Sequence, residues 1–487
     1  MASLRLVLPA LLLLATAAAA SGQEADTTRL GLDPAVRMAT LPNGLRYYIR
    51  ANRQPDRRAE LRLVVNAGSV LEDEDQRGLA HVVEHMAFNG TARFPKQALV
   101  DFIEGVGMRF GAHLNASTSF DETVYELQVP TDSTGILPRA LDVLQDWAQA
   151  VEFEPEEVER ERGVVIEEWR LGLGASSRIL NRQLPVLFHG SRYAERLPIG
   201  DRRTLEIFSR DALVRFYRDW YRPDLMAVIA VGDFDADSVE GMVRERFSTL
   251  AGPAAPRPRL VIPVPVVDTA LVAVATDPEA PGSRAGVTWR IPAREEGTVA
   301  AYRAALVERL RDRMLGDRLA ELTTRSDPPF IGAGAGRSSF VRGLPVYSAA
   351  VAVADGGLER GVGAVMTEVE RASRFGFTAT EFERARTELL RGYERAWAER
   401  DKTTSMAYVG EYVRHFLEGE PAPGIEAEYD LVRRLLPGIA LEEVSAAARQ
   451  PLSGRGLVLL VSAPEKPGLA VPDGRRLLAL VGEVARA

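Results

Sequence analysis

The chain has 487 residues and is 46% hydrophobic, which is enough to form two or more large domains with separate cores. Its 60 Lys and Arg against 68 Asp and Glu give a net charge of -8, without the basic excess of nucleic-acid-binding proteins, so we expect no nucleic-acid partner. The absence of cysteine excludes disulfides and thiolate ligands, so any metal site must use His, Asp and Glu.

The N-terminus, MASLRLVLPALLLLATAAAASGQEA, has the three parts of a secretory signal peptide. Arg5 supplies a positive charge, residues 6–14 form an apolar run, and residues 15–20 are small and suited to cleavage. The alternative is a membrane anchor, but the apolar run is too short to favour it. We therefore expect residues 1–22 to be removed on export to the periplasm or the medium. No later segment approaches 18 continuous apolar residues, so we expect no stable membrane span after cleavage.

Alternating apolar residues predict strands in the first part of the chain. Two strands are expected within residues 38–50, joined by a turn at Asn43 and Gly44, and another within 59–69. Residues 115–130 also alternate. The stretch LMAVIAVGDF, residues 225–234, predicts a buried strand that ends at Gly232 and is followed by an amphipathic helix.

Helical periodicity predicts several helices between these strands. Residues 72–88 begin with an acidic run, which is favourable at a helix N-terminus, and then become apolar. A second helix is expected to start at Pro95. Two more are expected at residues 137–151 and 155–171.

Residues 251–267, AGPAAPRPRLVIPVPVV, contain five prolines and predict a linker, because proline interrupts both helices and sheets. The expected domains are therefore residues 30–250 and 268–487. The second repeats the mixture of elements, with expected helices near residues 299–322, 357–375 and 379–400 and expected strands near 347–353 and 456–461.

The stretch GLAHVVEHMAFNG, residues 78–90, carries the chemistry of the first domain. On a helix, His81, Glu84 and His85 share one face, because positions i, i+3 and i+4 do. Two imidazoles one turn apart can bind one zinc ion, and the carboxylate can take a proton from an activated water. The alternative is a buried helix whose polar groups are satisfied by neighbouring side chains, and this pattern alone leaves both interpretations open.

The stretch PEEVERERGVVIEEWRL, residues 155–171, offers a third ligand. On a helical wheel, Glu161 and Glu168 fall on the apolar face with Val158 and Val165. A solvated acidic face fits these two carboxylates poorly, because an inward carboxylate requires a cation or hydrogen-bond donors. Glu168 would complete a site of two His and one Glu with an open position for water, and Glu161 would orient a ligand histidine.

The order HVVEH, NAST…ETVY and ERGVVIEEW resembles the inverted zinc motif, edge strand and glutamate helix of the pitrilysin/insulinase family of metalloendopeptidases. The residues of the stretches EHMAFNGTARFP and FDETVYELQVPTD are similar to those of the large bacterial periplasmic members of the family. The resemblance implies an α+β chain of two similar domains, each a mostly antiparallel sheet covered by helices as in pitrilysin and the mitochondrial processing peptidase. The first domain would carry the site, and the second would be non-catalytic.

The resemblance also implies roles for individual residues. His81, His85 and Glu168 would bind one Zn²⁺ per chain, Glu84 would be the general base, and Glu161 would support the ligands from behind. Glu168 lies 83 positions after His85 (168 − 85), several more than is common in the family. We interpret this as a loop insertion, which leaves Glu167 as an alternative ligand.

The tripeptide at Asn115 to Ser117 is formally a glycosylation sequon, as is the one at Asn89. The resemblance instead implies that Asn115 and Ala116 lie on an edge strand beside the zinc, where they pair with the backbone of an extended substrate. We favour this second interpretation.

Family members hold the substrate with an Arg and a Tyr seven positions apart, in the half or subunit that faces the zinc. The nearest stretch here has Thr323 and Phe330 at these positions. We therefore expect a second half or a partner chain to supply the clamp, unless the clamp is dispensable.

Together these features predict a zinc metalloendopeptidase acting on peptides or unfolded protein segments. Two alternatives stay open. One is a zinc amidase of another substrate class, such as cell-wall peptides, and the other is a non-catalytic peptide-binding or assembly subunit of a peptidase complex.

Overall fold

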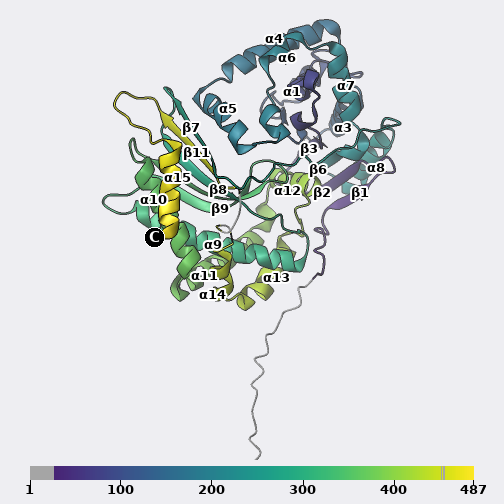
Figure 1. Cartoon of the computed structure of the whole chain (residues 1–487). Coiled ribbons are helices and arrows are strands. Elements are labelled where there is room, and N and C mark those ends of the chain that lie inside the picture. Colours follow the sequence, from purple (N-terminus) through teal and green to yellow (C-terminus); the bar gives the residue numbers. More distant parts are fainter. Residues whose placement is uncertain (1–26, 451, 453–455) are drawn as a thin grey trace, which may run out of the picture.

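The computed structural model describes residues 27–450, 452 and 456–487, which form two units side by side (Figure 1). Each unit is built on one mostly antiparallel sheet with helices against it, which confirms the predicted fold. The predicted signal peptide, residues 1–22, lies outside the described residues. None of the helices in the described part has the length and apolar character required to cross a membrane.

The first sheet has six strands within the described residues, in the order β1-β2-β6-β3-β5-β4. They are β1 (Arg37–Thr40), β2 (Arg46–Ala51), β3 (Arg58–Val65), β4 (Leu114–Thr118), β5 (Thr123–Pro130) and β6 (Met226–Gly232). Neighbouring strands are antiparallel except β2 and β6. Strand β6 is apolar throughout because both of its faces are buried. At the other end of the order, β4 pairs only with β5 among the described strands and forms an edge.

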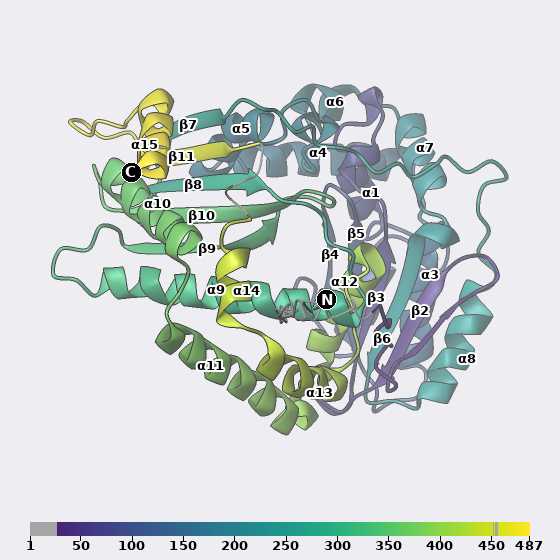
Figure 2. The same cartoon turned by 60° about the horizontal axis from the view of Figure 1, so that its bottom comes forward.

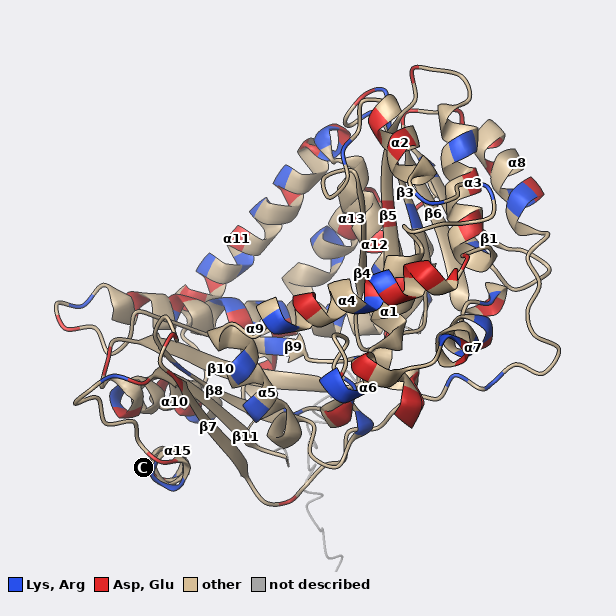
Figure 3. Ribbon diagram, turned by 90° about the horizontal axis from the view of Figure 1, so that it is seen from above, with Lys and Arg blue, Asp and Glu red and all other residues tan. Residues whose placement is uncertain are grey.

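The helices of the first unit pack their apolar faces with this sheet into the largest hydrophobic core. They are α1 (Leu79–Met86), α2 (Ala98–Gly105), α3 (Ile136–Gln149), α4 (Pro155–Leu171), α5 (Ala175–Leu187), α6 (Arg202–Ile207), α7 (Arg210–Trp220) and α8 (Ala236–Phe247). Helices α1 and α4 lie side by side (Figure 3). This contact brings together two sequence stretches that are about 80 residues apart.

The predicted helix start at Pro95 is wrong, because α2 begins at Ala98. Lys96 has φ 49°, a left-handed conformation that a right-handed helix cannot include. Pro95 instead forms an isolated bridge with Gly90. The proline therefore belongs to a turn that precedes the helix.

The second sheet has five strands in the described residues, in the order β7-β11-β8-β10-β9. They are β7 (Leu271–Asp277), β8 (Ser283–Arg290), β9 (Gly332–Ser339), β10 (Pro345–Val353) and β11 (Val458–Pro464). The helices of this part are α9 (Val299–Thr323), α10 (Leu358–Phe375), α11 (Ala379–Ala398), α12 (Ser405–Glu418), α13 (Ile425–Leu435), α14 (Leu441–Ala447) and α15 (Gly474–Arg486). Helix α11 carries both acidic and basic side chains along its length (Figure 3).

Each part of the chain contributes to the other unit. Helix α12 comes from the second part but packs on the first sheet, where Tyr408, Val409 and Tyr412 are buried against the face opposite the main core. In the other direction, α5 lies against β7 and β11, and the Gln183 side chain donates to the Val461 carbonyl at 2.9 Å. Both units therefore depend on segments that are distant in sequence.

The proline-rich segment, residues 251–267, contains no helix or strand. It is nevertheless attached to the first unit, because Val264 is buried in the first core. Arg259 also donates to the Asn66 carbonyl at 2.7 Å. These contacts hold the segment against the first unit at two separate points.

Candidate metal centre

Helix α1 presents His81, Glu84 and His85 toward α4. Its remaining side chains are apolar and fully buried, which fixes the rotation of the helix about its axis. The two imidazole rings lie one turn apart, with their centroids separated by 4.7 Å. The three polar groups are therefore directed to one place by the packing of the opposite face.

The N-terminus of α1 is held by a buried carboxylate from outside the helix. Gly78, which precedes the helix, has φ 99° and no side chain to cap the first turn. Glu72 replaces that cap, because its carboxylate accepts from the amides of Gly78 at 3.0 Å and Ala80 at 2.8 Å. Burial raises the pKa of Glu72 to about 8, against the opposite effect of these two hydrogen bonds.

A close approach of two glycines also locates this end of the helix. A Cβ on Gly200 would lie 2.5 Å from the Cα of Gly78, which is too close for any side chain. The loop that carries Pro198 and Ile199 therefore lies directly over the start of α1, and these two residues form one wall of the cleft.

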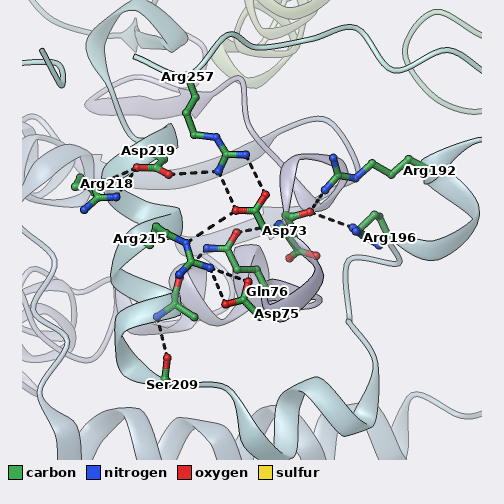
Figure 4. A network of polar contacts seen from close by, with 12 residues as sticks. Asp73, Asp75, Gln76, Arg192, Arg196, Ser209, Arg215, Arg218, Asp219 and Arg257 are labelled. Carbon is green, nitrogen blue, oxygen red and sulfur yellow. Dashed lines mark hydrogen bonds and ion pairs between the residues drawn. The ribbon is translucent and has the colours of Figure 1, made fainter. Parts of the chain in front are cut away.

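The residues just before α1 are held by the ion network of Figure 4. Asp73 pairs with Arg257 of the proline-rich segment at 2.9 Å, and Asp75 pairs with Arg215 of α7 at 2.7 Å. The Gln76 side chain donates to the Ala212 carbonyl at 2.8 Å. These contacts fix the approach of the chain to the histidine helix.

Helix α4 brings two glutamates to the histidines. The Glu161 carboxylate lies 3.0 Å from His85 Nδ1, so this nitrogen is the protonated one and Nε2 is directed away from Glu161. Glu168 Oε2 lies 3.3 Å from His85 Nε2 and 3.8 Å from His81 Nε2. Glu167, the alternative, instead pairs with Arg170 on the exposed side of the helix at 2.8 Å.

The donor atoms of His81, His85 and Glu168 fit a zinc ion. One atom from each lies within 4.8 Å of the other two. Ligand atoms about 2.0–2.1 Å from a tetrahedral zinc are separated by about 3.3 Å, close to the separations of the two His Nε2 atoms from Glu168. The nitrogens of His81 and His85 that face Glu168 are both Nε2, so these are the atoms available to a metal. His81 Nδ1, on the other side of its ring, is buried and has no hydrogen-bond partner in the described part of the chain.

The protonation of these groups follows from burial and their neighbours. Burial, followed by the adjacent His85 ring, lowers the pKa of His81 to about 4, so His81 is neutral at pH 7 and can ligate a metal. Burial lowers the pKa of His85, but Glu161 and the other nearby carboxylates together raise it by more, so the pKa lies above its ordinary value. Burial raises the pKa of Glu84, partly opposed by a hydrogen bond from Thr118. This shift toward neutral pH strengthens a carboxylate as a proton acceptor.

An open cleft of about 840 Å³ contains these groups and is bordered by β4. Ala116 and Thr118 lie on the half-buried face of that strand, and Asn115 is exposed on the other face. The Thr118 hydroxyl donates to Glu84 Oε2. Apolar side chains form part of the cleft lining, namely Phe88, Val100, Phe110, Val164, Pro198 and Ile199.

Residues 47–176 match the family described as "Insulinase (Peptidase family M16)", and residues 208–389 match "Peptidase M16 inactive domain". The chain is 35% identical to the "Zinc protease PQQL-like" of Arabidopsis thaliana, over 87% of this chain and 42% of the relative. It is 29% identical to the "Probable zinc protease PqqL" of Haemophilus influenzae, over 95% of this chain and 50% of the relative. The first half of the periplasmic protease PqqL from Escherichia coli superposes with a TM-score of 0.87 and 26% identity, covering 94% of this chain and 98% of that one. The chain belongs to the M16 peptidase family.

These matches confirm the resemblance to the pitrilysin/insulinase family. The M16 chain spans about half the length of the curated relatives it matches. Several relatives are named zinc proteases, in agreement with the donor set of α1 and α4.

Sequence analysis did not identify two polar residues of this M16 site, Thr118 and Glu72. Thr118 contacts Glu84. The one feature of the sequence that could have indicated this is the alternation of β4, which places Thr118 on the same face as Ala116. Glu72 lies in the acidic run before α1 and could be separated from its exposed neighbours only by its burial. The contact of Thr118 joins two elements that are not adjacent in sequence, whereas Glu72 contacts the start of the helix that follows it.

Proposed function

We propose that this chain is the zinc-bearing half of an endopeptidase that hydrolyses peptides or unfolded protein segments. The convergence of His81, His85 and Glu168 beside Glu84, in a cleft with a free strand edge, carries the proposal. We assign residues 30–250 to the peptidase domain, 251–267 to the linker and 268–487 to a non-catalytic domain. We further propose that residues 1–22 direct export, a role consistent with the word periplasmic in the name of the Escherichia coli relative.

The chain supplies two functions to the reaction, base catalysis and substrate alignment. When bound, zinc supplies a Lewis acid that polarises the scissile carbonyl and makes a water molecule more acidic. Glu84 accepts the water proton and passes it to the leaving amine. Thr118 holds one oxygen of Glu84, which leaves the other oxygen for the proton. Glu161 keeps His85 Nε2 directed toward Glu168.

We propose that substrate pairs with β4 through Asn115 and Ala116. The strand has a partner on one side only, so its other edge can accept an extended peptide through main-chain hydrogen bonds. Such pairing recognises the main chain of the substrate and tolerates varied side chains. This favours peptide substrates over the more restricted substrates of a zinc amidase. A binding or assembly subunit would have no evident use for Glu84.

The positions of Thr323 and Phe330 support a clamp supplied from elsewhere. Phe330 is 3% exposed and belongs to the second hydrophobic core. The Thr323 hydroxyl donates to the Ala320 carbonyl at 2.7 Å, at the end of α9. Phe330 is buried, and Thr323 has neither the charge of an arginine nor the ring of a tyrosine, so we propose that a second half or partner chain provides the Arg–Tyr pair.

Residues 23–487 expressed alone are therefore expected to bind zinc but to cleave an unstructured peptide slowly. Substrate positioning and oxyanion stabilisation are each worth several kcal/mol, and both would be incomplete without the clamp. Addition of a second half or partner bearing the Arg–Tyr pair should raise the rate by roughly 10²-fold or more. The measurement is turnover of one fluorogenic peptide, with native mass determined in parallel. Family-typical turnover by the monomer would contradict the requirement for a clamp, and no turnover with either arrangement would contradict the peptidase assignment.

Glu161→Gln is expected to weaken zinc binding by roughly 10- to 100-fold without preventing it. Glutamine keeps the size of the side chain but loses the charge that orients the His85 ring and increases its basicity. Competition with a zinc chelator measures the affinity directly. Glu159→Gln is the matched control, because Glu159 lies on the exposed side of the same helix and pairs with Arg162. Equal zinc affinities in the two variants would exclude this role for Glu161.

A further inference from the structure

We propose that Arg342 of the second unit is a positioning residue that holds the edge strand β4 beside the zinc cleft. The proposal deepens the proposed function and rests on it, because it concerns the strand on which the substrate is aligned. It also assigns a role to Asp121 and Glu122, which belong to the FDETVY stretch but do not line the cleft.

The turn between β4 and β5, residues 119–122, is held on one side by the first unit. The amide of Ser69 donates to the Ser119 carbonyl at 3.1 Å, and that of Val70 donates to the Phe120 carbonyl at 2.9 Å. Gly68 permits this approach, because a Cβ there would lie 2.4 Å from the Ser119 carbonyl oxygen. The turn is therefore attached to the segment that leads to α1.

Arg342 holds the other side of the same turn. It lies in the loop between β9 and β10, and its backbone amide donates to Asp121 Oδ2 at 3.2 Å. Its guanidinium donates to Glu122 Oε2 at 2.8 Å and to the side-chain oxygen of Asn66. Arg259 donates to Asp121 Oδ1 at 3.3 Å. Two arginines thus neutralise two adjacent carboxylates at this turn.

The loop that presents Arg342 has a fixed position. Its flanking residues Val341 and Leu344 are 7% and 2% exposed and belong to the core of the first unit, although the loop joins two strands of the second sheet. Gly343 has φ 78°, a left-handed conformation that allows the sharp turn after Arg342. In Figure 2 the strands of the second sheet run toward β4 and β5. Arg342 therefore acts from a rigid support.

The position of the turn explains why its restraint matters. Strand β4 has five residues and pairs only with β5 among the described strands, so the turn that joins the two strands is one of the places where it is held. Thr118, which donates to Glu84, is the last residue of β4 and directly precedes the turn. Loosening the turn would displace Thr118 and the substrate-pairing residues Asn115 and Ala116 together. Through Arg342, the non-catalytic unit determines how substrate lies against the zinc site.

The test compares Arg342→Ala and Arg342→Lys with the control Arg360→Ala, all in the full chain. Arg360 is an arginine of the same unit, and its ion pair with Asp327 is exposed and outside this turn. Amide hydrogen exchange in residues 114–118 is expected to rise about tenfold in Arg342→Ala, while exchange in residues 79–86 and zinc content stay unchanged. The dissociation constant of an unstructured peptide, measured by fluorescence anisotropy on the Glu84→Gln background, is expected to rise about tenfold as well. Lysine should restore only part of both effects, because it cannot contact Glu122 and Asn66 with a planar fork.

Two outcomes would overturn the proposal. One is exchange and peptide affinity in Arg342→Ala equal to those of Arg360→Ala. The other is an equal rise in exchange throughout α1 and β4, which indicates a general loss of stability. If Arg342→Ala does not fold, Glu122→Gln removes one contact of Arg342 and the same comparison applies to it. The exchange measurement requires no catalysis, so a protein without peptidase activity would contradict the proposed function and still test the role of Arg342.

Discussion

Glu84→Gln is expected to abolish most peptide hydrolysis while leaving zinc content and folding unchanged. Glutamine fits the space of Glu84 and can accept the hydrogen bond from Thr118, but it cannot take a proton from water. Removal of a general base costs roughly 10²- to 10⁴-fold in rate. The measurement is kcat on a fluorogenic peptide, made in the presence of the proposed second half or partner, alongside elemental analysis of zinc.

The matched control for this result is Glu156→Gln, which changes an exposed glutamate in the first turn of α4. A rate for Glu84→Gln near that of the control, with unchanged zinc, would require a different proton acceptor. Loss of both zinc and activity would place Glu84 among the metal ligands instead.

His85→Ala is expected to eliminate stoichiometric zinc binding, and Glu168→Gln to weaken it severely. Each change removes a donor from a group of three that lies within 4.8 Å, and the two remaining protein donors bind zinc poorly. The loss should exceed the roughly 10- to 100-fold effect of removing a supporting hydrogen bond. Elemental analysis after dialysis against a weak chelator measures the retained zinc.

Glu167→Gln provides the control for the carboxylate. Glu167 neighbours Glu168 in sequence but is directed to solvent with Arg170, so its loss should leave zinc binding intact. Stoichiometric zinc in both His85→Ala and Glu168→Gln would contradict this assignment of the metal centre. Zinc loss in Glu167→Gln alone would show that α4 is rotated relative to its position here.

The local spacing of residues indicated each half of the candidate metal centre. His81, Glu84 and His85 share a face of any helix, and so do Glu161 and Glu168, because these intervals are close to whole turns. The apolar residues beside them predict an inward face, and this is correct for the buried Glu161. It is wrong for Glu168, whose side chain is 49% exposed because it borders the open cleft. Helical periodicity also predicted α4 at residues 155–171, the bounds that the structure has.

The predicted helix start at Pro95 was wrong because the backbone there does not adopt the conformation that the residue type favours. Pro95 is a favourable first residue of a helix, but Lys96 adopts a left-handed conformation and delays α2 to Ala98. The turn formed with Gly90 determines this conformation, and that pairing leaves no periodic signal.

In the sequence itself, short-range periodicity indicated most of the helices and strands, and the prolines of residues 251–267 indicated the division into two parts. The resemblance to the pitrilysin/insulinase family supplied the two similar α+β domains and the roles of the candidate metal ligands. Only the tertiary structure separated Glu168 from Glu167, placed Thr118 on Glu84, and attached Arg342 to the turn after β4. It also placed α12 on the first sheet and α5 against the second. These contacts join residues that are far apart in the chain. Which residues meet depends on how the helices and sheets pack, and local sequence patterns do not predict that packing.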